Sequence, residues 1–130
     1  MANSQDVFRE IVDTEVSRHP TRHAVHHREF ALERPREGAK ALHYLQRRYS
    51  DFFAGRVRVL DTGGGNGGFL LPFAELSTSE CIWIDRKNPA ELTELIRRTG
   101  ARIRRVLADA SALPLGSNTI DIMEFASSRS

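Results

Sequence analysis

The sequence has little of several features that mark specialised classes of protein. It contains a single cysteine, Cys81, so an internal disulfide is excluded and a reducing, cytoplasmic location is expected. No apolar run approaches the ~20 residues that a membrane-spanning helix needs, and the N-terminus lacks the basic region and apolar core of a secretory signal. The formal net charge is only +2, an excess too small to indicate a nucleic-acid partner.

What is present is the composition of one globular domain. The chain has 130 residues, of which 40% are hydrophobic and 28% charged, as in an ordinary soluble protein with a real core. We interpret the densest basic patch as a solvated face with favourable charge at a helix C-terminus, rather than as a site for nucleic acid or an acidic partner. That patch comprises Arg97, Arg98, Arg102, Arg104 and Arg105.

Two helices are predicted before the first strand. Residues 5–18 have an apolar face at helical spacing, and His19-Pro20 ends this helix. A second helix is expected to begin near Pro35 and to stop at Gly55. The apolar face of the first helix is Val7, Phe8, Ile11, Val12 and Val16, and that of the second is Leu42, Leu45, Tyr49, Phe52 and Phe53. These helices form an N-terminal helical segment, residues 1–54, ahead of residues 55–130.

A polar connector containing several histidines is expected between these helices. His23, His26 and His27, with Glu29 nearby, match no metal motif, so no metal site is predicted. Surface exposure and contact with a substrate or cofactor are the remaining interpretations of this segment.

A glycine turn follows the first predicted strand. Val57, Val59 and Leu60 indicate a short buried strand that Asp61 closes, and residues 63–68 then place five glycines in six positions. A helical pattern runs on to about Leu76, with Pro72 inside it. Glycine suits a tight turn that a ligand approaches closely, and N–H groups at the helix start would favour a polar or anionic ligand edge.

Strands and helices alternate through the rest of the chain. We expect a loop over 77–80, strands over 81–84, 103–108 and 120–125, and a loop over 110–118. A helix capped by Asn88 should have Pro89 at its first position and end at Gly100. This order predicts an α/β protein with a Rossmann-like parallel sheet of about four strands and two N-terminal helices.

Three successive predicted strands end in an aspartate. These residues are Asp61, Asp85 and Asp109. In parallel sheets, ligands bind outside the carboxyl ends of the strands, so the three carboxylates should line one edge of one cleft.

These residues resemble the class I S-adenosylmethionine-dependent methyltransferases. Residues 59–67, Val-Leu-Asp-Thr-Gly-Gly-Gly-Asn-Gly, match that family's Val-Leu-Asp-x-Gly-x-Gly-x-Gly motif. Ile84-Asp85 matches the acidic end of its second strand. Residues 108–115 and 120–121 resemble its Asp-Ala-x-x-Leu-Pro-Phe loop and fourth strand, with Leu115 in place of the Phe.

The resemblance implies a cofactor, S-adenosyl-L-methionine, and a role for each matching residue. The turn residues Gly63, Gly64, Gly65 and Gly67 would meet the methionine part, and Asp61 would accept a hydrogen bond near its amino group. Asp85 would accept from both ribose hydroxyls, Asp109 would face the adenine amino group, and Ala110 would offer its N–H to the ring. The reaction implied is methyl transfer to an unidentified small-molecule acceptor, with no catalytic residue identified.

The chain supplies fewer strands than the seven of that family's sheet. On this resemblance the chain is a fragment, a decayed copy or half of an assembly, and the sequence leaves these alternatives open. We expect little methyl transfer from residues 1–130 alone. The fourth strand is expected to be an exposed sheet edge that could support self-association or bind a partner chain.

Two further functions remain open on the sequence. One is a non-catalytic module that binds the cofactor or a partner. The other is an NAD(P)-binding domain, because Gly63, Gly65 and Gly68 also satisfy Gly-x-Gly-x-x-Gly, with Asp85 for the ribose and Arg86 for a 2′-phosphate.

Overall fold

The computed structural model describes residues 3–18, 22–76, 78–108 and 122–125. Its sheet contains β1 (Val57–Thr62), β2 (Ser79–Asp85), β3 (Ile103–Leu107) and β4 (Ile122–Phe125) in the order β3-β2-β1-β4. Every neighbouring pair is parallel. The predicted α/β class and parallel sheet are therefore confirmed.

The order of strands reverses at β1. From β1 the chain moves outward through α3 (Leu71–Ala74) to β2 and through α4 (Ala90–Thr99) to β3, whereas β4 lies on the other side of β1. In open parallel sheets such a reversal places a ligand crevice at the carboxyl end of the central strand. The loop after β1 is the glycine turn, so this turn lies at the expected position of a site.

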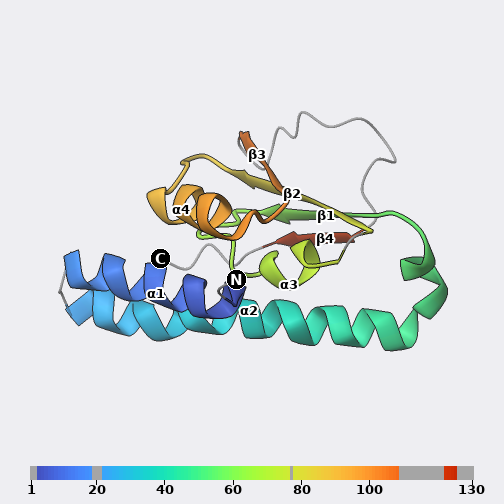
Figure 1. The fold of residues 1–130 in the computed structure, drawn as a ribbon, viewed down its shortest axis with the longest axis horizontal. Helices are drawn as coiled ribbons and strands as arrows, with labels where there is room; N and C mark the ends of the chain where they lie inside the picture. Colours follow the sequence, from blue (N-terminus) through green and yellow to red (C-terminus); the bar gives the residue numbers. More distant parts are fainter. Residues whose placement is uncertain (1–2, 19–21, 77, 109–121, 126–130) are drawn as a thin grey trace.

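The helices lie in two layers on one side of the sheet (Figure 1). α3 and α4 lie next to the strands, and α1 (Ser4–Arg18) and α2 (Arg22–Arg48) form a long pair beneath them. Side chains of α1 and α2 share a buried cluster with Leu71 of α3 and Leu95 of α4. A second cluster joins α3 and α4 to β1 and β2, and a third, made by Leu60, Ile82 and Ile84, lies on the opposite face of the sheet.

The second helix differs most from its prediction. It begins at Arg22, so His23, His26 and His27 lie in α2 and the predicted polar connector is wrong. Pro35 lies inside the helix rather than at its start. A proline in a helix interior removes one backbone hydrogen bond, but Pro35 is buried and packing along the helix offsets that cost.

The end of this helical region also differs from the sequence pattern. α2 ends at Arg48, and Phe52 and Phe53 belong to a separate 3-10 helix, η1 (Ser50–Ala54). Phe53 still packs against the main core, which explains the apolar pattern in the sequence.

The helix after the glycine turn is shorter than predicted. It has four residues, and Pro72 lies in its first turn, where the missing N–H would have had no helical partner. β2 begins at Ser79, so the predicted 77–80 loop is wrong at its last two residues.

Of the two helix ends predicted for α4, one is correct. Gly100 ends it in the left-handed conformation, with φ 69°, as expected. Asn88 does not cap it, because Pro89 occupies the N-cap position and the Asn88 side-chain oxygen accepts a hydrogen bond from Arg105. β3 ends at Leu107, one residue early, and the predicted loop over 110–118 lies outside the described residues.

One close contact fixes α2 against the glycine turn. A Cβ atom added at Gly38 would lie 2.2 Å from the backbone oxygen of Phe69, the residue that follows the turn. No larger residue fits at this point of α2 without movement of one backbone. No helix within the described ranges combines the length and apolar character of a membrane span.

Candidate functional site

The glycine turn adopts a conformation that glycine permits and most residues resist. Gly63, Gly65 and Gly67 have φ of 66°, 55° and 82°. L-residues in this left-handed region cost roughly 1–2 kcal/mol each. The first reason for the glycine-rich sequence is therefore the left-handed backbone conformation at these three positions.

Three of the glycines are also required by packing, and at Gly68 an added Cβ would lie 2.8 Å from Cζ of Phe8. A Cβ at Gly64 would lie 2.3 Å from the Trp83 ring, and one at Gly67 would lie 2.6 Å from Cδ1 of Leu92. At Gly65, by contrast, a Cβ would meet nothing within 4 Å. Gly65 is therefore the glycine over which a ligand has room to approach the backbone.

The backbone N–H groups of the five glycines in the turn all have acceptors within the protein. Those of Gly63 and Gly64 donate to the carbonyl of Ile84 at 2.7 and 3.2 Å. Gly67 donates to Gly64 at 3.1 Å, and Gly68 donates to the side chain of Asn66 at 2.9 Å. The N–H of Gly65 donates to Oδ2 of Asp85 at 3.1 Å. These five amides are therefore engaged within the protein and are not available to an anionic ligand.

Strand β2 holds both sides of the Gly65 backbone. Oδ2 of Asp85 accepts from its N–H, and Nε1 of Trp83 donates to its carbonyl at 2.9 Å. The other Asp85 oxygen accepts from the N–H of Arg86 at 2.7 Å. Trp83 is fully buried and Asp85 only partly so, which leaves the Asp85 carboxylate next to solvent at the carboxyl end of β2.

Asp61 has a different position from Asp85. It is 0% exposed, and its Oδ2 lies 3.2 Å from the Cβ position of Gly64. Asp61 is therefore beneath the turn and contributes no surface to a ligand.

A cavity of about 380 Å³ lies between the glycine turn and the N-terminal helices. Gly65 and Asn66 form its turn wall, and α1 and α2 form its helical wall; Pro89 and Glu91, at the start of α4, complete it. The helical wall is made by Val12, Glu15, Val16, His27, Arg28 and Ala31. The volume falls within the range of small-molecule sites.

Charged side chains of both signs lie around this cavity. Glu15 and Glu91 line it, and Asp85 is bonded to Gly65 on its turn wall. Arg28 also lines it, but its Nε donates to Asp13 at 2.6 Å, so its charge is matched by an ion pair. The cavity thus combines apolar side chains with carboxylate acceptors, of which Glu15 is itself paired with Arg18.

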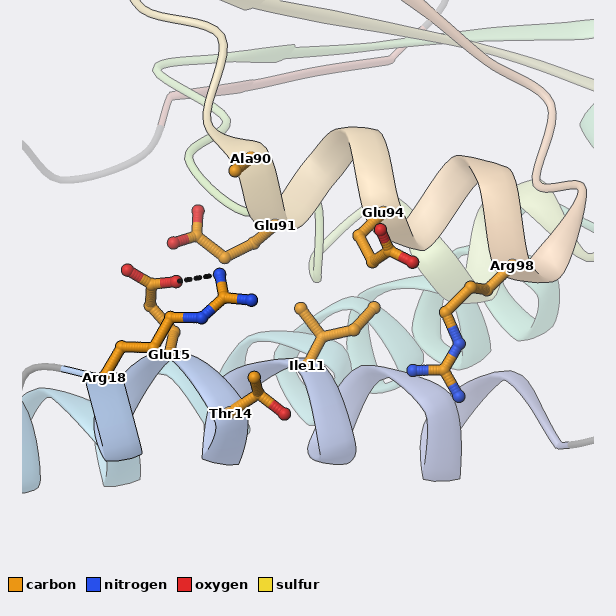
Figure 2. Close-up of a pocket in the computed structure, with 8 residues that line it drawn as sticks. All are labelled: Ile11, Thr14, Glu15, Arg18, Ala90, Glu91, Glu94 and Arg98. Atoms are coloured by element: carbon orange, nitrogen blue, oxygen red, sulfur yellow. Dashed lines mark ion pairs between the residues drawn. The ribbon is translucent and has the colours of Figure 1, made fainter.

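A smaller groove of about 270 Å³ adjoins the cavity between α1 and α4 (Figure 2). Glu15 and Glu91 line both spaces. Arg18 forms an ion pair with Glu15 at 3.8 Å, and Arg98 of α4 pairs with Glu10 of α1 at 3.1 Å. The pair of Arg98 with Glu10 ties α4 to α1 beside the cavity, whereas the pair of Arg18 with Glu15 lies within α1.

The residues predicted for the site do not all reach the cavity. Gly65 lines it and Asp85 is bonded to Gly65, whereas Asp61 lies beneath the turn and Gly64 and Gly67 face the side chains packed beneath it. Gly63 and Arg86 are exposed and are not among the residues that line it. Asp109 and Ala110 lie outside the described residues.

The helical wall was missed as part of a site. Val12 and Val16 were recognised in the sequence as one apolar face, and His27 as a candidate contact. These faces meet the glycine turn because of the way α1 and α2 pack against the rest of the domain. No local sequence pattern encodes that packing. The only local signal is that Val16 continues the apolar face of α1; that it is partly buried and lines the cavity comes from the structure.

The arginine-rich patch is largely engaged within the protein. Arg97 pairs with Glu94 and Arg98 with Glu10. Arg105 donates to Thr93 at 2.8 Å, and Arg102 donates to the carbonyl of Leu76 at 3.2 Å. These contacts agree with the interpretation of the patch as a structural and solvated face.

Cysteine and metal chemistry have little support in the described part of the chain. Cys81 is buried in β2, and burial raises the pKa of its thiol to about 12, which keeps it protonated and unreactive at neutral pH. Across the described ranges, no group of three or more His, Cys, Asp or Glu side chains is placed to hold a metal ion.

Comparisons with protein-family models, with curated proteins and with solved structures found no match to this chain.

Proposed function

We propose that the cavity binds S-adenosyl-L-methionine and that the chain acts in methyl transfer to a small-molecule acceptor. The observation that carries the proposal is the state of the glycine turn. Its five glycine N–H groups are used within the protein, and one of them, that of Gly65, donates to the Asp85 carboxylate.

The turn is unsuited to a pyrophosphate group. Dinucleotide sites hold pyrophosphate on N–H groups of the turn and the helix N-terminus. Here those glycine amides are engaged, and the helix that follows has only four residues. Asp85 does not discriminate, since a carboxylate at this strand end could bind the ribose of either cofactor. The engaged amides are what disfavour the NAD(P) alternative.

The same features suit a ligand with hydroxyls and a positive centre. Each Asp85 oxygen accepts one backbone N–H and retains a lone pair that can accept from a ribose hydroxyl. Glu91 places a carboxylate on the cavity wall, which favours a cation there, and the open space over Gly65 lets a ligand pack against its Cα. The residues present thus fit S-adenosylmethionine, whose sulfonium carries a positive charge.

The protein's part in the reaction would be mainly alignment. The bound cofactor supplies an activated methyl group, and the residues around the cavity would orient the acceptor and exclude water. The apolar side chains Val12, Val16 and Ala31 are the described surface against which an acceptor or the cofactor could pack.

Calorimetric titration tests the proposal. We expect S-adenosylmethionine and its demethylated product to bind more tightly than NADH or NADPH, and inorganic pyrophosphate not to compete. Tighter binding of either nicotinamide nucleotide, or displacement by pyrophosphate, would contradict it.

A further inference from the structure

Trp83 connects the buried core to the turn wall of the cavity. It is the only tryptophan of the chain and has no exposed surface. Its ring packs under Gly64, while its Nε1 donates to the carbonyl of Gly65. One side chain thus contacts two successive residues of the turn from below.

The bond from Trp83 completes a clamp on Gly65. Asp85, two residues later on the same strand and therefore on the same face, accepts from the Gly65 N–H. Both polar groups of the Gly65 backbone are held by β2, and no atom lies within 4 Å of the space where its Cβ would be. The Gly65 backbone is therefore held from the side of β2, with open space where its Cβ would be.

A ligand binds with a smaller loss of conformational entropy to a turn that is already ordered in the free protein. A ligand that packs against Gly65 does not have to fix its backbone first, so the ordering cost is removed from the binding free energy. If Trp83 orders the Gly65 backbone, the affinity for the ligand depends on Trp83 even though this side chain is not among those that line the cavity.

We propose that Trp83 is a positioning residue for the ligand of this cavity, acting through the Gly65 carbonyl. The inference rests on the proposed function for the identity of the ligand. Trp83 should also report binding through its fluorescence. A ligand over Gly65 changes the surroundings of the peptide group that accepts the indole hydrogen bond.

The main test compares Trp83→Phe with a matched control. Trp83→Phe keeps an aromatic ring and removes the N–H, and should lower affinity for the demethylated cofactor about threefold to tenfold, as expected for loss of one net hydrogen bond. Cys81→Ala is the control, because Cys81 lies two residues earlier on β2 in the same buried cluster. Both changes should reduce the free energy of unfolding, but only Trp83→Phe should reduce affinity.

Three further measurements keep the inference testable if Trp83→Phe folds poorly. Replacement of Trp83 by β-(3-benzothienyl)alanine retains the shape and removes only the donor, and should weaken binding like Trp83→Phe. In either variant the Gly65 amide should exchange its hydrogen faster than in the wild type. Wild-type tryptophan emission should change on titration with the demethylated cofactor.

The outcomes separate the inference from the proposed function. If the wild type does not bind the methionine nucleosides, the proposed function fails, while amide exchange at Gly65 still tests the clamp. If the wild type binds and the donor-free variants bind equally well with unchanged exchange, the role of Trp83 is refuted. An equal loss of affinity in Cys81→Ala would also refute it, because general destabilisation would then explain the effect.

Discussion

The turn wall and the helical wall of the cavity are held by different kinds of contact. The turn wall is fixed by left-handed glycines, by two side chains of β2 and by buried residues directly beneath it. The helical wall is held by an apolar cluster around Phe8 and Ile11 and, at its surface, by half-exposed ion pairs such as Arg28 with Asp13. The first wall should tolerate almost no substitution, whereas the surface of the second should tolerate many.

The largest effect is expected at Gly67, on the buried side of the turn. Gly67→Ala would place a side chain in the left-handed region and against Leu92. We expect a loss of about 2–5 kcal/mol in the free energy of unfolding, from backbone strain and overpacking together. Denaturant titration would measure it, with Gly100→Ala as control, because Gly100 has a similar φ but open space around it. Equal losses in the two variants would show that packing under the turn is unimportant.

The next effect is expected at Asp85. Asp85→Ala should lower affinity for the methionine nucleosides by about 1.5–3 kcal/mol, since hydrogen bonds to a charged acceptor are lost. The structure adds a loss of stability, because the N–H groups of Gly65 and Arg86 lose their acceptor. The affinity and the stability of Asp85→Asn should lie between those of the wild type and Asp85→Ala, because one oxygen acceptor remains. Calorimetry and denaturant titration measure the two quantities, and unaltered affinity in Asp85→Ala would reduce the residue to a structural role.

Gly65 should separate binding from folding. Gly65→Ala adds a methyl group to open space, so its cost in stability should be only the backbone strain, about 1–2 kcal/mol. The same methyl would occupy the cavity and should weaken ligand binding. Gly100→Ala is again the control, with a comparable stability loss and normal binding. A Gly65→Ala variant with wild-type affinity would mean that the ligand does not approach the turn.

The smallest effect is expected where the helical wall is tied to α4. Arg98→Gln removes the ion pair with Glu10, a contact in which Glu10 is 64% exposed. The expected loss is about 0.2–1 kcal/mol and should shrink as salt is added. Thermal unfolding at low and high ionic strength measures it. A loss as large as that of Gly67→Ala would erase the contrast between the two walls.

The sequence predicted the turn wall better than the helical wall. Glycines at positions of positive φ and Asp85 at a strand end are local signals, and each could be read from a few neighbouring residues. The role of Trp83 was not predicted, because an indole donor bonded across the turn depends on the registry of β1 and β2. The helical wall depends on the docking of α1 and α2, and the pattern in α2 was misread because Pro35 suggested a helix start.

Pro35 lies between two parts of α2 that are held differently. Toward the C-terminus, Gly38 is locked against the Phe69 backbone, and toward the N-terminus, Ala31 lines the cavity. The proline ring removes the N–H that an α-helix would bond to the carbonyl of Ala31, and helices bend most readily at such residues. Gly38 is thus an anchor between α2 and the turn, and Pro35 removes one backbone hydrogen bond from the part of the same helix that lines the cavity.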